Sequence, residues 1–153
     1  MTVMTRWLDS DEQRTWRAYL AASRALMDTL DRELQRDAGM PHAYYELLVR
    51  LSESPGHRLR MSDLAEAVGS SRSRLSHAVA RLEAAGWVRR EECPTDRRGQ
   101  VALLTDEGFA TLAAAAPGHV EGVRRHLFDA LSPAQVDQLR RISETLADHL
   151  TGS

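Results

Sequence analysis

Apolar residues recur every three or four positions in the first third of the chain, the spacing that is typical of amphipathic α-helices. The first helix is predicted over residues 10–38, with Ser10 as its N-cap and Gly39 after its last turn. A second helix is predicted over residues 42–52, and the Ser54-Pro55-Gly56 stretch that follows favours a turn. We therefore expect the N-terminal third to be helical.

The C-terminal third, residues 106–151, shows the same helical spacing. Pro117 and Gly118 fall inside this stretch, and we expect them to kink or break the helix there. Ser132 and Pro133 then have the residue types of an N-cap and a first helical position, so they predict the start of a last helix.

Residues 57–104 carry shorter elements separated by turn-forming residues. A brief strand is predicted at 57–60. A short helix capped by Ser62 and Asp63 then runs to residue 68, and a turn at Gly69 leads to a helix over 71–85. The two helices and the turn between them have the pattern of a helix-turn-helix. Two segments, Trp87–Glu91 and Gln100–Leu104, flank a turn-rich stretch and predict a β-hairpin. The expected fold is mainly α with a small β-wing.

Composition narrows the class of protein. A chain of 153 residues with 42% hydrophobic and 27% charged residues is expected to form one globular domain over 1–153. The single cysteine excludes a disulfide framework, and no apolar run approaches the roughly 20 residues of a membrane span. The N-terminus lacks a signal-peptide pattern, so a cytoplasmic protein is expected. Common enzyme motifs are missing from the sequence, which argues against an enzyme.

Basic residues are concentrated in the middle of the chain. All 20 are arginines, and residues 57–100 hold nine of them against six acidic residues, whereas the flanks are acidic overall. On the helix predicted over 71–85, Leu75, Val79, Leu82 and Ala85 share one face, and the opposite face has no acidic residue before Glu83. Small and basic side chains allow close approach to a DNA groove and donate hydrogen bonds to it. The predicted DNA contacts are Ser71, Arg72, Ser73, Arg74, Ser76, His77 and Arg81; an ordinary solvated face is the alternative.

The hairpin tip supplies a second group of predicted DNA contacts. Arg97 and Arg98 lie beside Gly99, where they can project into an adjacent minor groove. Asp96 is expected to hold one of these guanidinium groups in position or to bind backbone amides of the turn. An exposed charged turn without a DNA contact is the alternative.

Two motifs resemble the MarR (multiple antibiotic resistance regulator) family. They read Leu82-Glu83-x-x-Gly86-Trp87-Val88-x-Arg90 and Asp96-x-Arg98-Gly99-x-x-Ala102-x-Leu104-Thr105-x-x-Gly108, with Ala102 where the family usually has Val. The resemblance covers essentially the whole chain. It implies a winged helix-turn-helix module over residues 42–104 between dimerisation helices at 10–38 and 106–151.

The resemblance also implies a function. It predicts a homodimer that binds pseudo-palindromic double-stranded DNA, with the helix 71–85 in the major groove, the wing 91–100 and Arg98 in the minor groove, and Asp96 bracing the wing. Family members are often repressors released by a small ligand. A ligand-independent DNA-binding protein and a protein-interaction module that has lost DNA binding remain alternatives. The apolar stripes of the terminal helices favour dimerisation independently, unless they only complete the core of one chain.

An effector pocket between the dimerisation helices and the winged module is a further implication of the resemblance. The candidate residues are Trp16, Arg17, Tyr19, His42, Tyr44 and Tyr45, and the expected effector is a small aromatic or phenolic compound; plain core packing is the alternative. No cofactor is expected, and the six histidines lack metal-ligand spacing. Glu91 and Glu92 are expected to raise the pKa of Cys93, which argues against a redox role.

Overall fold

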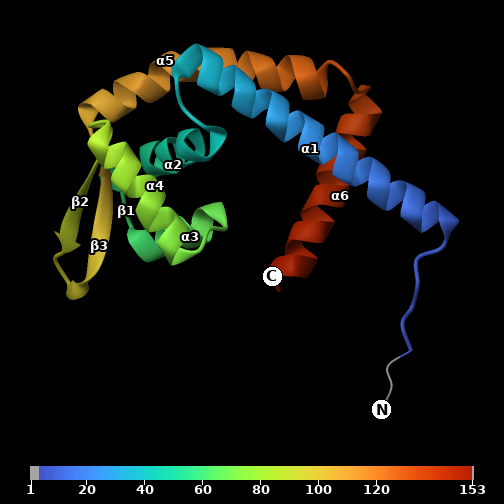
Figure 1. Ribbon diagram of the computed structural model, residues 1–153, viewed down its shortest axis with the longest axis horizontal. Helices are drawn as coiled ribbons and strands as arrows, with labels where there is room; N and C mark the ends of the chain where they lie inside the picture. Colours follow the sequence, from blue (N-terminus) through green and yellow to red (C-terminus); the bar gives the residue numbers. More distant parts are fainter. Residues whose placement is uncertain (1–3, 153) are drawn as a thin grey trace. The chain divides into compact units, whose positions relative to one another are not determined.

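The computed structural model describes residues 4–152, except for the side chains of residues 97 and 98. It is mostly helical with one small sheet, so the predicted fold class is confirmed (Figure 1). The elements are α1 (Ser10–Ala38), α2 (His42–Glu53), η1 (Pro55–His57), β1 (Arg58–Arg60), α3 (Met61–Val68), α4 (Arg72–Ala84), β2 (Val88–Cys93), β3 (Asp96–Leu104), α5 (Asp106–Val123), η2 (Arg124–Phe128) and α6 (Pro133–Thr151).

The chain forms two compact units. The first unit contains the residues up to Leu30 and those from Gly122 on, whereas the second unit is the continuous segment Asp31–Glu121. The helix-turn-helix α3–α4 and the whole sheet therefore belong to the second unit. Within the described residues, no helix combines the length and the apolar character that are needed to cross a membrane.

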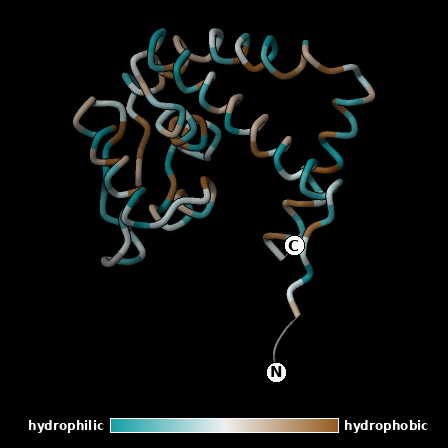
Figure 2. Tube along the Cα trace, turned by 45° about the vertical axis from the view of Figure 1, so that its right-hand side comes forward, coloured by the Kyte–Doolittle hydropathy of each residue, from teal (hydrophilic) through white to brown (hydrophobic). Residues whose placement is uncertain are grey.

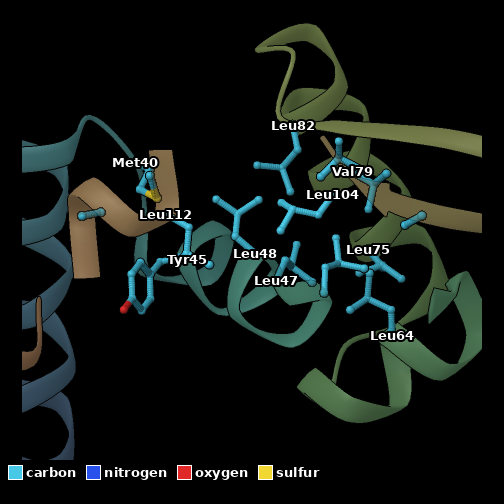
Figure 3. Packing of buried hydrophobic residues seen from close by; sticks show 14 of the residues in the cluster. Met40, Tyr45, Leu47, Leu48, Leu64, Leu75, Val79, Leu82, Leu104 and Leu112 are labelled. Carbon is cyan, nitrogen blue, oxygen red and sulfur yellow. The ribbon is translucent and has the colours of Figure 1, made fainter. Parts of the chain in front are cut away.

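Aliphatic side chains from α2, α3, α4 and β3 form the core of the second unit. Figure 3 shows Leu48 of α2, Leu75 and Val79 of α4 and Leu104 of β3 converging. Burying each such side chain contributes about 1.5–3 kcal/mol to stability. This core fixes α4 against the sheet, so one face of α4 is turned inward and the other outward.

The sheet has the strand order β1-β3-β2 and is antiparallel throughout. Leu59 of β1 pairs with Ala102 of β3, and Val88 of β2 pairs with Leu104. An irregularity between Glu92 and Cys93 interrupts the β2–β3 ladder near the hairpin turn. The predicted hairpin is confirmed, and both strands run further toward the tip than the predicted ranges 87–91 and 100–104.

Thr105 connects the base of the wing to α5. Its hydroxyl donates a hydrogen bond to the carbonyl oxygen of Gly86 at 2.7 Å and accepts one from the Gly108 amide at 3.0 Å, so Thr105 is also the N-cap of α5. A Cβ on Gly108 would overlap the carbonyl oxygen of Trp87. The Leu104-Thr105-x-x-Gly108 motif therefore allows α5 to begin in direct contact with the segment that connects α4 to β2.

The first unit leaves large apolar side chains in solvent. Those of α1, α6 and the segment before α1 are Met4, Trp7, Leu8, Trp16, Tyr19, Met27, Leu139, Ile142, Leu146 and Leu150. Hydrophobic and hydrophilic positions alternate along these helices (Figure 2). A groove of about 700 Å³ between α1 and α6 is lined by Ala18, Tyr19, Ile142 and Leu146, among others. The apolar stripes therefore extend beyond what one chain buries.

Two predicted N-caps are wrong, although α1 has the predicted bounds, Ser10–Ala38. The N-cap of α1 is Asp9 rather than Ser10, because the Asp9 carboxylate accepts a hydrogen bond from the Glu12 amide at 2.8 Å and the Glu12 carboxylate accepts one from the Asp9 amide at 3.0 Å. Helix α3 begins at Met61, before the predicted cap. Of the kink or break expected at Pro117, the break is absent, because helix α5 continues through Pro117 to Val123.

Candidate nucleic-acid interface

Helix α4 presents an outer face that is polar and basic. It begins after Ser71, whose hydroxyl accepts a hydrogen bond from the Arg74 amide at 3.3 Å. Leu75, Val79 and Leu82 are at most 2% exposed, so the opposite side of the helix must face solvent. Ala85 was expected in the core but is exposed, because α4 ends at Ala84.

Six of the seven predicted contact residues on α4 are exposed. They are Ser71, Arg72, Ser73, Arg74, His77 and Arg81. Ser76 differs, since it is half-buried and its hydroxyl accepts a hydrogen bond from Nη1 of Arg90 at 3.4 Å. The outward face thus offers hydroxyl, imidazole and guanidinium donors over three turns without a carboxylate.

Arg90 joins β2 to α4 through more than one bond. Its Nε donates to Oε1 of Glu83 at 2.6 Å, and its backbone amide donates to Oε2 of the same carboxylate at 3.3 Å. The two side chains are only 26% and 31% exposed. Glu83, the first acidic residue of α4, is therefore occupied by Arg90 rather than presented freely to solvent.

The wing lies beside the N-terminal ends of α3 and α4. A groove of about 510 Å³ separates them and is lined by Arg60, Ser62, Arg72 and Gln100, among others. Asp96 is exposed and begins β3. The side chains of Arg97 and Arg98 lie outside the described residues, so their minor-groove contacts and the bracing role of Asp96 remain predictions.

Arg60 is a candidate that the sequence reasoning missed. It ends β1, lines the groove beside the wing and donates a hydrogen bond from Nη2 to the Thr95 hydroxyl at 2.8 Å. Its place among the nine arginines of residues 57–100 was a signal, but only the pairing of β1 with β3 brings it to the wing.

The effector-pocket candidates form one group in each unit. In the first unit, the rings of Trp16 and Tyr19 stack with centroids 6.3 Å apart, and Arg17 donates to Gln13 at 3.4 Å. In the second unit, His42 and Tyr45 lie near each other with centroids 6.5 Å apart. Tyr44 packs against the core. The candidates of the second unit are thus partly core residues, as the alternative interpretation held.

His119 of α5 completes the group in the second unit, and sequence reasoning did not connect it with His42. Its ring centroid lies 4.4 Å from that of Tyr45 and 5.4 Å from that of His42, and its Nδ1 is buried without a hydrogen-bond partner in the described structure. Burial lowers the pKa of His119, and His42 lowers it further. Burial raises the pKa of the Tyr45 hydroxyl. Among the described residues, no group of three or more His, Cys, Asp or Glu could hold a metal ion.

The expectation of a raised pKa at Cys93 is wrong. Its sulfur lies 3.4 Å from the Thr95 hydroxyl, and hydrogen bonds from Thr95 lower the pKa of the thiol. The side chain is buried at the base of the hairpin turn. Glu91 and Glu92 are neighbours in sequence, but the hydrogen bonds made across the turn decide the direction of the shift.

Comparisons with known proteins agree with this geometry. A profile of the MarR family matches residues 38–99. Sco3205, a MarR family transcriptional regulator from Streptomyces coelicolor solved in complex with DNA, is 58% identical, with a TM-score of 0.92 over 95% of this chain and 92% of that chain. AbsC, a MarR family transcriptional regulator from the same organism, is 48% identical, with a TM-score of 0.91 over 97% of this chain and 100% of that chain.

The transcriptional repressor MprA of Escherichia coli K12 is a more distant relative. It is 31% identical over 112 residues, which are 73% of this chain and 63% of MprA. The match therefore spans less than two thirds of MprA. All of these relatives are transcriptional regulators rather than enzymes.

Proposed function

Because the chain belongs to the MarR family of transcriptional regulators, we propose that it is a homodimeric, sequence-specific DNA-binding protein that represses transcription. The observation that carries this proposal is the outward face of α4, which is exposed, basic and free of carboxylates from Ser71 to Arg81. Surface helices usually mix charges of both signs, whereas a helix that enters a groove benefits from an acid-free face.

In the proposed complex, α4 lies in the major groove. Arg72, Arg74 and Arg81 have the fork geometry to bind guanine edges or phosphates, and the small Ser73 and Ala80 allow close approach. The wing lies at the adjacent minor groove, where Arg98 is the predicted contact. The similarity to Sco3205, which was solved in complex with DNA, supports this arrangement.

The first unit supplies the proposed dimer interface. Trp7 is 86% exposed and Ile142 is 59% exposed, and such side chains are unfavourable in water unless a partner covers them. In a two-fold symmetric dimer, each chain covers this apolar surface of the other chain. The dimer then has two copies of α4, one for each half-site of a pseudo-palindrome.

Release by a small ligand is part of the proposal. A compound with an aromatic ring and an acidic group suits the His42 and Tyr45 side chains of the second unit. We place the protein with its DNA in the cytoplasm. A panel of aromatic and phenolic acids, added to the preformed protein–DNA complex, tests the proposed release.

The central experiment is a DNA-binding titration. The purified protein is titrated into a fluorescent duplex taken from upstream of its own gene, at two salt concentrations, with unlabelled random duplex as competitor. We expect tight binding that resists the competitor and weakens steeply with salt, because phosphate contacts release counterions. The Arg98→Ala variant is expected to bind several-fold more weakly with a flatter salt dependence.

If the duplex from upstream of the gene is not bound tightly, selection of bound fragments from the whole genome tests whether the operator lies elsewhere. If no genomic fragment is preferred over random duplex, the proposed function is wrong. The winged fold would then serve a protein partner.

A further inference from the structure

Helix α4 and the wing are joined by a network of three side chains. Arg90 of β2 contacts Glu83 of α4 at 2.6 Å through Nε and Ser76 of α4 at 3.4 Å through Nη1. Ser76 and Glu83 are seven residues apart, so one guanidinium contacts two positions on α4 that are about two helical turns apart. The Arg90 backbone amide also donates to Glu83, which ties the position of the strand itself to the helix.

The restricted exposure of this network makes it more persistent than an ordinary surface ion pair. Arg90 and Glu83 are 26% and 31% exposed, whereas Arg89 and Glu91 on the same strand are 60% and 40% exposed. Partial burial reduces screening by salt, and contacts in several directions restrict the rotamers of both side chains. The network is therefore suited to hold α4 and β2 in one fixed relation.

We propose that the Glu83–Arg90–Ser76 network is a positioning device that sets sequence specificity: it fixes α4 relative to the wing, so that both engage a cognate site together. This inference rests on the proposed function. Glu83 and Arg90 act through α4 and the wing and do not themselves contact DNA. Ser76 serves the network through its hydroxyl rather than donating to a base.

For Glu83→Gln, an effect of charge alone and a loss of positioning change the affinity for the cognate duplex in opposite directions. Glu83→Gln removes a negative charge near the DNA-binding face, so a purely electrostatic effect tightens binding to every duplex. Loss of positioning instead weakens binding to the cognate duplex and leaves binding to random duplex equal or tighter. The cognate-to-random affinity ratio therefore separates the two explanations, because a purely electrostatic effect leaves it unchanged whereas loss of positioning lowers it.

The experiment uses the full-length protein and the duplex that the wild type selects from a random library. We expect Glu83→Gln to lower the cognate-to-random affinity ratio about tenfold. The matched control is Glu91→Gln, which makes the same charge change on the wing at a residue whose ion pairs lie within the sheet, with Arg89 of β2 at 3.3 Å and Arg58 of β1 at 3.9 Å. This control is expected to keep the wild-type ratio.

Two further measurements identify how Arg90 acts. Arg90→Lys keeps the charge but cannot contact Glu83 and Ser76 together, and we expect it to lower the ratio with a melting temperature near that of the wild type. Arg90→Gln is expected to leave the salt slope of cognate binding unchanged, since no phosphate contact is lost; a slope reduced by about one would show that Arg90 binds phosphate and would overturn the inference.

An unchanged or raised cognate-to-random affinity ratio in Glu83→Gln also overturns the inference that the network sets specificity. A wild-type protein that selects no duplex from the library contradicts the proposed function instead, so the two failures are distinct.

Discussion

Gly108, in the first turn of α5, lies against the backbone of Trp87 and within reach of Leu104. A Cβ at this position would overlap the Trp87 carbonyl oxygen and approach Cδ1 of Leu104 to 2.8 Å. Gly108→Ala is therefore expected to lower the free energy of unfolding by about 2–3 kcal/mol, measured by urea denaturation.

Gly118 in the same helix is the control, because a Cβ there meets nothing within 4 Å. Gly118→Ala is expected to raise the free energy of unfolding by up to about 1 kcal/mol. Equal effects of the two substitutions would contradict the steric explanation.

His119 gives the protein a pH-dependent contribution to stability. Its pKa in the folded chain is lowered by burial and by His42, although Glu33 opposes the shift. The unfolded chain therefore binds a proton more readily, and the stabilising contribution is fully present above about pH 6.5 and is lost as the pH falls toward the lowered value.

His119→Gln removes this titration, so its free energy of unfolding is expected to fall less than that of the wild type between pH 7 and pH 5. His149→Gln, on the exposed surface of α6, is the control and should retain the wild-type pH dependence. A His119→Gln profile parallel to that of the wild type would exclude this role for His119.

The residue types on α4 were largely predictable from the sequence, whereas their partners were not. The 3.6-residue period placed Leu75, Val79 and Leu82 inward because an amphipathic helix has only one apolar face. The pairing of Glu83 with Arg90 depends on how the chain turns at Gly86, where φ is +83°. Local spacing does not encode such a contact.

At the scale of elements, the proposed DNA binding by the outward face of α4 depends on the absence of negative charge from that face. Ala80 is exposed on this face, and Ala80→Glu places a carboxylate where phosphates are expected. We expect cognate affinity to fall at least about tenfold at low salt with little change in melting temperature, measured by anisotropy and thermal denaturation.

Ala43→Glu makes the same substitution at an exposed position of α2. It is expected to retain nearly wild-type affinity. Equal losses in both variants would indicate a general charge effect rather than a groove contact of α4.

Helix α5 shows why the boundaries of elements were harder to predict than their types. Pro117 removes one backbone hydrogen bond and crowds the preceding turn, which is why a kink or break was expected. The preceding alanines favour the helix, and Leu112 and Ala115 pack into the core of the second unit. Tertiary packing and the high helix propensity of alanine thus outweigh the cost of one proline.

At the scale of the whole molecule, the proposed dimer depends on the apolar surface of the first unit. Ile142 and Leu146 of α6 are one helical turn apart, and both line the groove beside α1. Ile142→Glu is expected to shift the protein from dimer to monomer in analytical ultracentrifugation, because a charge in an apolar interface loses its hydration.

The monomeric Ile142→Glu variant should also lose most of its cognate affinity, since only one half-site is bound at a time. Glu144→Gln, an exposed change on the same helix, is expected to remain dimeric. A dimeric Ile142→Glu variant would place the interface elsewhere.

The division of the chain into two units has a genetic consequence. DNA contacts are assigned to the second unit, and assembly of the proposed dimer to the first, so the two activities can be lost separately. A chain altered only at Ala80 still pairs with wild-type chains and inactivates the mixed dimers, so its allele should be dominant. A chain altered at Ile142 cannot enter a dimer, so its allele should be recessive, because the wild-type chains then pair only with one another.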